Sequence, residues 1–306
     1  MNIINTIIPI FLIIGVGWFA RKKSWMTDTF VNPANRLVYY LAIPALIFKA
    51  IYSNPLKSNI NVTVLAITLS SVCITAFLVW LISSSVKARS TRGTFIQSSV
   101  HGNLGYFGLA VVFYYLGREG LVKASLIAAF MMIVQNFISV FALQVYSGDA
   151  REDQRSLWFF AKKIMSNPVI LAALLGIAFS LTGLKLPSVI SRTLDIISSF
   201  ALPLALLIIG ATLSFKVIRS RPLHLFASSV LKAIVLPGMG VFLFRMFDIG
   251  PDLFLPGLIL LAAPTATVAT VMAKEMNGDI EFAGAAVSLS TLLSAVTYTW
   301  WLHFVS

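Results

Sequence analysis

Two long apolar segments of the chain are interrupted near their centres by residues that break helices: HGNLGYFG at residues 101–108 and AAPTAT at residues 262–267. The first stretch holds three glycines, and the second holds a proline, which has no amide hydrogen to donate. A helix broken at the centre of a membrane exposes backbone groups that lipid cannot satisfy, so such a break persists only beside protein or a water-filled cavity. These two stretches decide which kind of membrane protein the sequence predicts.

The composition of the chain requires a membrane. Hydrophobic residues make up 58% of the 306 residues and charged residues only 11%, with a mean hydropathy of +0.90. Soluble domains are about a quarter charged, so this composition argues against a soluble enzyme, a nucleic-acid binder and a disordered chain. The net charge of +12 is explained by Lys and Arg in cytoplasmic loops rather than by nucleic-acid binding. Cys73 alone cannot form an intrachain disulfide, and we expect it to be a small core residue.

The apolar segments predict an all-α polytopic membrane protein, because about 20 apolar residues are needed to cross the hydrocarbon as a helix. We predict ten spans, at about residues 3–20, 34–52, 62–83, 93–116, 120–145, 160–182, 190–213, 222–245, 254–274 and 280–304. The longest polar break between them is 147–156, which we expect to be a linker.

The basic residues predict the orientation, since cytoplasmic loops carry an excess of Lys and Arg. With both termini outside, fifteen of them fall on inner connectors and six on outer ones. The inner set is Arg21, Lys22, Lys23, Arg36, Lys87, Arg89, Arg92, Arg151, Arg155, Lys162, Lys163, Lys216, Arg219, Arg221 and Lys274. The outer set is Lys57, Arg118, Lys123, Lys185, Arg192 and Arg245. The linker at 147–156 is then cytoplasmic.

An internal repeat relates the two halves of the chain, 1–146 and 157–306. A shift of 159 residues places Pro9 on Pro168, Gly17 on Gly176, and the AIP of residues 42–44 on the ALP of residues 201–203. It also places Gly105 on Pro264, so the two helix-breaking sites coincide. Because each half holds five predicted spans, the second half is inverted. Inverted repeats are typical of secondary transporters, whose substrate sites lie where corresponding helices are broken.

Two broken helices offer a site for an anion. Each resumed half-helix begins with free amides and the positive end of its dipole. Pro264 suits the first position of the resumed helix, and Asn103 can cap the other or donate its amide to a carboxylate. Thr265 and Thr267 add hydroxyl groups nearby. The alternative is that the glycines of the first stretch, Gly105 among them, only allow close helix packing.

Other polar side chains inside the spans have two interpretations each. Gln135 and Asn136 could line the site or bond between helices, and Lys232 could neutralise an anion, pair with an acid or snorkel. His101 could titrate near neutral pH or be structural. Asp195 is expected to be a wetted or paired acid. The candidate substrate-binding residues are His101, Asn103, Gly105, Gln135, Asn136, Lys232, Pro264, Thr265 and Thr267.

The sequence predicts no catalytic residue, metal site or cofactor. It contains no HExxH, Gly-x-Ser-x-Gly or Walker pattern. Carboxylates are missing from the span centres, which weakens the case for a proton or sodium relay without excluding it.

Three segments resemble the auxin efflux carrier family in its short bacterial form: NRLVYYLAIPALIF at 35–48, GNLG at 102–105, and AAP at 262–264 followed by MAKEMN at 272–277. The resemblance, within the bile acid/auxin/arsenite transporter superfamily, implies two inverted five-helix repeats whose fourth and ninth helices cross at their breaks. It implies a homodimer in the bacterial cytoplasmic membrane. It also implies a scaffold of helices 1, 2, 6 and 7 and a moving unit of helices 3–5 and 8–10.

The resemblance also implies a function: alternating-access, elevator-type transport of a small organic anion, such as malonate, malate or an auxin-like carboxylate. Plant members have Asn-Pro-like features at both crossings, whereas this chain has Asn103-Leu104 and Ala263-Pro264, which favours a small carboxylate over auxin. Two alternatives stay open. A sodium- or proton-coupled symporter of the bile-acid type would require its coupling ion, and a channel or sensor would not show saturable counter-exchange.

The orientation gives the first testable prediction. Epitope tags at Ser306 and at Gly148 should be accessible from outside and from inside the cell, respectively, because the basic residues hold 147–156 in the cytoplasm. Antibody labelling of intact and permeabilised cells measures this. Labelling of Ser306 only after permeabilisation would contradict both the orientation and the count of ten spans.

Overall fold

The computed structural model describes residues 3–53, 61–146, 167–214 and 222–305, and these residues are helical apart from short connections. Seven helices are long and apolar enough to cross a membrane by length and composition, and two shorter apolar helices accompany them. The seven are Ile3–Lys22, Asp28–Tyr52, Val62–Ser85, Leu104–Tyr146, Ser188–Thr212, Pro222–Met246 and Ile280–Val305. The predicted class, an all-α polytopic membrane protein, is therefore confirmed.

The first half of the chain contains α1 (Ile3–Lys22), α2 (Asp28–Leu37), η1 (Val38–Ala42), α3 (Ile43–Tyr52), α5 (Val62–Ile82), η2 (Ser83–Ser85), α6 (Arg89–Val100), η3 (Leu104–Gly108) and α7 (Leu109–Tyr146). The second half contains α9 (Pro168–Thr182), α10 (Ser188–Ser199), α11 (Ala201–Thr212), α12 (Pro222–Val230), η5 (Leu231–Val235), α13 (Leu236–Met246), α14 (Pro251–Ala262), α15 (Val268–Glu275) and α16 (Ile280–Val305). The predicted linker 147–156 lies outside the described residues.

The start of the second helical segment differs from the prediction, whereas the connection between the fourth and fifth spans agrees with it. The second helical segment begins at Asp28 rather than near 34, because Asp28 favours a helix N-terminus and Pro33 is accommodated within the helix that follows. The apolar stretch Leu104–Tyr146 holds two helices that meet at Gly117, between the predicted fourth and fifth spans. Gly117, with φ 70° and ψ −159°, bends this segment sharply, which a glycine permits without strain. The predicted connection at 116–120 is therefore confirmed as the place where two helices meet.

Prolines explain local widening of two helices. A π-helical turn, η1, precedes Pro44, and a second one, η5, precedes Pro237. Proline removes one amide donor and clashes with the carbonyl four residues before it, so the preceding turn widens. η5 carries Lys232, and the widened turn therefore sets the position of that side chain.

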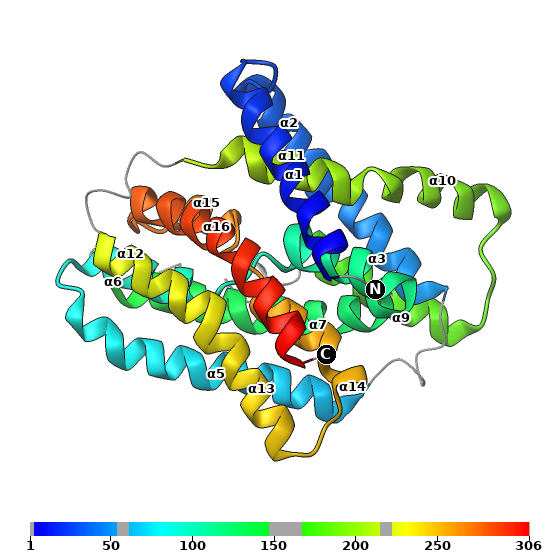
Figure 1. Cartoon of the computed structure of the whole chain (residues 1–306). Helices are drawn as coiled ribbons and strands as arrows, with labels where there is room; N and C mark the ends of the chain where they lie inside the picture. The colour runs from blue at the N-terminus through cyan, green and yellow to red at the C-terminus, as the bar shows by residue number, and fades with distance from the viewer. Residues whose placement is uncertain (1–2, 54–60, 147–166, 215–221, 306) are drawn as a thin grey trace.

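The helices form two groups (Figure 1). In the first group, α1 packs on α11, α3 packs on α9 and α10, and α2 packs on α11. The second group contains α5, α6, α12, α13, α14, α15 and α16, with α7 running between the groups and contacting both. Both broken helices belong to the second group or to α7, so the packing there positions the candidate site.

Apolar side chains cover the outside of the bundle. On α1, for example, Ile4, Ile8, Leu12 and Val16 recur every four residues and are all at least half exposed. Residues at this spacing share one helix face, and an apolar face of this kind is what lipid requires. Cys73 is also exposed, so the expectation that it is a core residue was wrong; it faces outward from α5 with its apolar neighbours.

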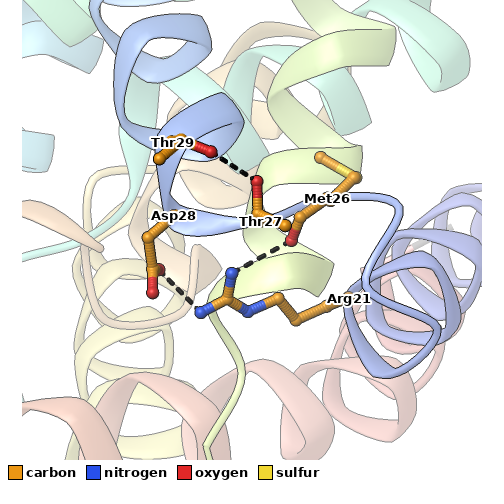
Figure 2. Close-up of polar contacts among 5 residues, drawn as sticks. All are labelled: Arg21, Met26, Thr27, Asp28 and Thr29. Atoms are coloured by element: carbon orange, nitrogen blue, oxygen red, sulfur yellow. Dashed lines mark hydrogen bonds and ion pairs between the residues drawn. The ribbon is translucent and has the colours of Figure 1, made fainter.

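Arg21 organises the turn between α1 and α2 (Figure 2). Its guanidinium donates to the Met26 carbonyl (3.0 Å) and to the Asp28 carboxylate (2.6 Å), while the Thr27 and Thr29 hydroxyls bond each other at 2.7 Å. The Asp28 side chain is 76% exposed, so this ion pair adds little stability. Its effect is to fix the direction in which the chain leaves α1.

Glycines allow α1 and α11 to touch backbone to backbone. A Cβ atom added to Gly17 would overlap the Leu207 carbonyl, whereas one added to Gly15 would meet no atom within 4 Å. Gly17→Ala should therefore lower the free energy of unfolding by about 1–3 kcal/mol through overpacking. Gly15→Ala is the matched control on the same helix and should be neutral or stabilising by about 0.5–1 kcal/mol, because alanine favours a helix. Thermal unfolding in detergent measures both, and equal melting temperatures would contradict the packing.

Candidate functional site

The two broken helices meet and hydrogen-bond to each other at their breaks. The first break, residues 101–103, separates α6 from η3, and the second, residues 263–267, separates α14 from α15. Gly102 and Thr265 form an antiparallel bridge, the only strand-like pairing among the described residues. Two backbone hydrogen bonds form this bridge: the Asn103 amide donates to the Pro264 carbonyl at 2.7 Å, and the Ala266 amide donates to the His101 carbonyl at 2.9 Å. We call these two breaks together the crossing.

The long helix α7 supports the first break. The Gly102 amide donates to Gln135 Oε1 at 3.1 Å, and the His101 ring Nδ1 lies 3.0 Å from the Ser139 hydroxyl. The Asn103 carbonyl then accepts from the amides of Phe107 and Gly108, which starts the resumed helix. All the residues of this break are buried. The backbone groups of residues 101–103 are thus all bonded within the protein, as the membrane interior demands.

The second break is held by hydroxyl groups and by one lysine amino group. The Thr265 amide donates to the Ser290 hydroxyl at 3.0 Å, and the Thr265 hydroxyl donates to the Ser98 carbonyl at 2.7 Å. Lys232 Nζ donates to the Leu261 carbonyl, in the last turn of α14, at 2.8 Å. These bonds come from α16, α6 and η5, so three neighbouring elements keep the break open.

The structure corrects three expectations about individual residues. Pro264 is not the first residue of the resumed helix, because α15 begins four residues later at Val268. Gly105 does not lie in the break, because helical turns resume at Leu104; Gly102 is the glycine that pairs with Thr265. Asn103 begins the resumed helix through its backbone carbonyl, and its side chain makes no capping bond.

Several donors at the crossing have no acceptor. The Asn103 side chain is only 6% exposed and forms no hydrogen bond with any described residue, and Gln135 Nε2 is fully buried without a partner. The amides of Gly105 and Tyr106, in the first turn after the break, meet no backbone acceptor within the described part of the chain. Native proteins rarely leave buried donors unpaired, so such donors point to a bound group. An anion beside the positive end of a half-helix can accept hydrogen bonds from these donors.

The remaining predicted residues have different environments. Thr267 lies next to the start of α15, is partly exposed, and its hydroxyl bonds no described residue. Asn136 points back along α7, where its Nδ2 donates to the Met132 carbonyl at 2.8 Å. The structure therefore brings together His101, Asn103, Gln135, Pro264, Thr265 and Lys232 at the crossing, with Thr267 at its edge, and leaves Asn136 bonded within its own helix.

Sequence reasoning missed the residues that support the crossing. Ser98, Ser139 and Ser290 each bond directly to it, and all three are fully buried. Tyr106 also escaped notice, although its hydroxyl donates to Asn35 on α2, 2.9 Å from the side-chain oxygen. A signal existed for Ser98, since the polar run Gln97-Ser98-Ser99 immediately precedes the break. Isolated serines in apolar helices carry no such signal.

Asp195 and Asp279 bond residues outside the crossing. Asp195 pairs with Lys49 between α10 and α3, which confirms that it is a paired acid. Asp279 instead bonds Thr91 and the Phe282 amide at the start of α16. Within the described ranges no three His, Cys, Asp or Glu side chains lie close enough to hold a metal ion. The crossing is therefore rich in donors and has no acidic group of its own.

The chain matches the family model described as "Membrane transport protein" over residues 2–302. It is 22% identical to the "Putative malonate transporter" of Rhizobium meliloti (strain 1021), over 99% of this chain and 96% of that protein. It is 24% identical to an "Uncharacterized transporter" of Methanothermobacter thermautotrophicus, over 98% of each chain. It is also 23% identical to the "Uncharacterized transporter YfdV" of Escherichia coli (strain K12), over 98% of this chain and 96% of that protein.

The hydroxyl of Thr265 gives a test of how the crossing is held. Thr265→Val leaves the buried Ser98 carbonyl without its donor, which should cost about 1–3 kcal/mol of the free energy of unfolding. Thr267→Val is the matched control and should change it by about 0.5 kcal/mol or less, because that hydroxyl bonds no described residue. Thermal unfolding of the two purified variants measures both changes in stability. Equal destabilisation would mean that the Thr265 hydroxyl does not hold the break.

Proposed function

We propose, because the chain belongs to the membrane transport protein family, that it is a secondary transporter carrying a small organic anion across the bacterial cytoplasmic membrane. Family membership confirms the resemblance to auxin efflux carriers and makes the chain a membrane transporter. The observation that carries the proposed substrate class is the set of unpaired donors at the crossing. The mechanism we propose is alternating access of the elevator type.

The electrostatics of the crossing support an anionic substrate. Two half-helices start there, at Leu104 and at Val268, and each contributes the positive end of its dipole. Asn103 and Gln135 Nε2 add unpaired amide donors within the first break and beside it. A carboxylate accepts hydrogen bonds and donates none, so it would satisfy this set without requiring an arginine.

A dicarboxylate of three or four carbons fits best. The Rhizobium meliloti relative is named for malonate, and the identity of 22% supports the chemical class rather than the compound. Two half-helix starts could each receive one carboxylate of malonate or malate. An auxin-like monocarboxylate would leave one of the two positive ends without a partner, so we place it second.

Correspondence between the two halves supports ten helices in two inverted repeats. Shifted by 159 residues, the starts of α2 and α7 at residues 28 and 109 fall on residues 187 and 268. The observed starts of α10 and α15 are at residues 188 and 268.

The glycine contacts between the halves exchange under the same shift. Gly17 packs on the backbone of Leu207, and its counterpart Gly176 packs on the backbone of Phe48, which is the counterpart of Leu207. A two-fold axis between the halves would produce this exchange. An axis of that kind lying in the membrane plane is the usual symmetry of inverted repeats.

The division into two groups of helices supports an elevator. In our proposal α1–α3 and α9–α11 form the scaffold, through which two copies associate as a homodimer, and both chain termini lie outside. The remaining helices form the unit that moves with the substrate. Few polar contacts join the two groups among the described residues, and Tyr106 to Asn35 is one of them. Sliding of the moving unit would break few hydrogen bonds.

Two observations of transport separate this proposal from its alternatives. Purified protein in proteoliposomes preloaded with malonate should take up labelled malonate by counterflow, which a channel or a sensor cannot do. A requirement for sodium or for a proton gradient would identify a symporter of the bile-acid type instead. A thermal-shift screen against carboxylates, amines and sugars should first show stabilisation by carboxylates alone, since a ligand stabilises the fold that binds it.

Asn103 provides the test of the site. Asn103→Ala should weaken malonate binding about 10- to 150-fold, because a hydrogen bond to a charged group in a dry site is worth about 1.5–3 kcal/mol. Asn136→Ala is the matched control, since that amide is already bonded within α7. Isothermal titration of folded protein with malonate gives both dissociation constants. Unchanged affinity in the Asn103 variant would mean that its side chain does not contact the substrate.

A further inference from the structure

Lys232 is a fully buried lysine that lies against both broken helices. Its side chain is 0% exposed, and its Nζ donates to the Leu261 carbonyl in the last turn of α14 at 2.8 Å. A Cβ atom added to Gly102, in the other break, would lie 3.2 Å from both Cε and Nζ of Lys232. The ammonium group is therefore positioned between the end of one half-helix and the backbone of the other.

The cost of burying this charge is offset by backbone dipoles rather than by an acid. Ion pairs among the described residues join Arg21 to Asp28 and Lys49 to Asp195, and Lys232 has none. A charged side chain inside a membrane needs a partner in the protein, and full burial rules out snorkelling to the surface. The partner here is the carbonyl end of α14, which carries the negative end of the helix dipole.

A free carbonyl end at a broken helix is a cation site. In secondary transporters with broken helices, such carbonyls coordinate the coupling cation while the opposite half-helix starts receive the anionic substrate. In this chain the position next to the Leu261 carbonyl is filled by an amino group that is covalently part of η5.

We propose that Lys232 is a tethered cation that takes the place of a soluble coupling cation at the crossing. This inference rests on the proposed function. It neutralises the carbonyl end of α14 and supplies a fixed positive charge behind the anion site. Lys232 acts as a positioning residue: it is sealed from the substrate and keeps the crossing in the charge state that binds an anion.

The test uses counterflow of labelled malonate in proteoliposomes with choline as the only cation on both sides, and then with sodium or methylammonium replacing choline. The rate of malonate counterflow by wild-type protein should be the same in all three media. In choline the counterflow rate of Lys232→Ala should be lower than that of wild type by about tenfold or more, because the substitution removes a charged hydrogen bond. Sodium or methylammonium should restore it, since each is small enough to enter the space left by the side chain, and choline is not.

Two further variants control for packing and for net charge. Lys232→Met keeps most of the side-chain volume without the charge, so it should be slow in every medium and resist rescue. Lys87→Met removes a positive charge from an exposed position and should behave as wild type. Gel filtration of each variant verifies its fold. If the alanine variant does not fold, the methionine variant and the wild-type comparison still decide the proposal.

Any one of four results would contradict the proposal that Lys232 is a tethered cation. The first two are a wild-type counterflow rate that depends on sodium and a Lys232→Ala rate in choline equal to that of wild type. The other two are a Lys232→Ala rate that neither sodium nor methylammonium restores and a fully active Lys232→Met. Failure of the proposed function has a different signature. In that case wild-type protein shows no malonate counterflow in any medium.

Discussion

A pair of backbone hydrogen bonds inside the membrane underlies the whole arrangement. The Asn103 amide to the Pro264 carbonyl and the Ala266 amide to the His101 carbonyl join two helices at the points where each has lost its own bonds. An unsatisfied backbone group in an apolar medium costs several kcal/mol, so neither break could exist alone. Each break is the partner of the other, and surrounding Ser, Thr, Gln and Lys side chains bond further backbone groups beside it.

The bonds that the crossing leaves unmade define what it can bind. Carbonyl groups at the break are bonded by Thr265, by Lys232 and by the facing backbone, while donors at Asn103 and Gln135 stay unpaired. This imbalance favours a ligand that accepts hydrogen bonds and carries negative charge. The tethered ammonium of Lys232 strengthens the same preference from the opposite side of the break. Fold and proposed function thus have one physical origin, which is the unequal satisfaction of donors and acceptors.

Glycine and proline placement was enough to locate the breaks, because these residues act through local backbone chemistry. Asp195 was likewise recognisable as a wetted or paired acid, although its pairing with Lys49 is a tertiary fact. The details of the crossing were not predictable in the same way. The constant shift of 159 gives positions that correspond in the two halves, such as Gly105 and Pro264, and does not give the contact between Gly102 and Thr265. Ser98 and Ser290 matter only through the helices that face them, and no sequence period encodes that contact.

The most direct test of the account is the position of a bound carboxylate. Crystals grown with bromomalonate would place the bromine by its anomalous signal and the carboxylates by the density around it. The account predicts a carboxylate within hydrogen-bond distance of the Asn103 side chain and the half-helix start at Gly105, with the Lys232 ammonium still on the Leu261 carbonyl. A carboxylate bound away from the crossing, with Asn103 and Gln135 still unpaired, would contradict it.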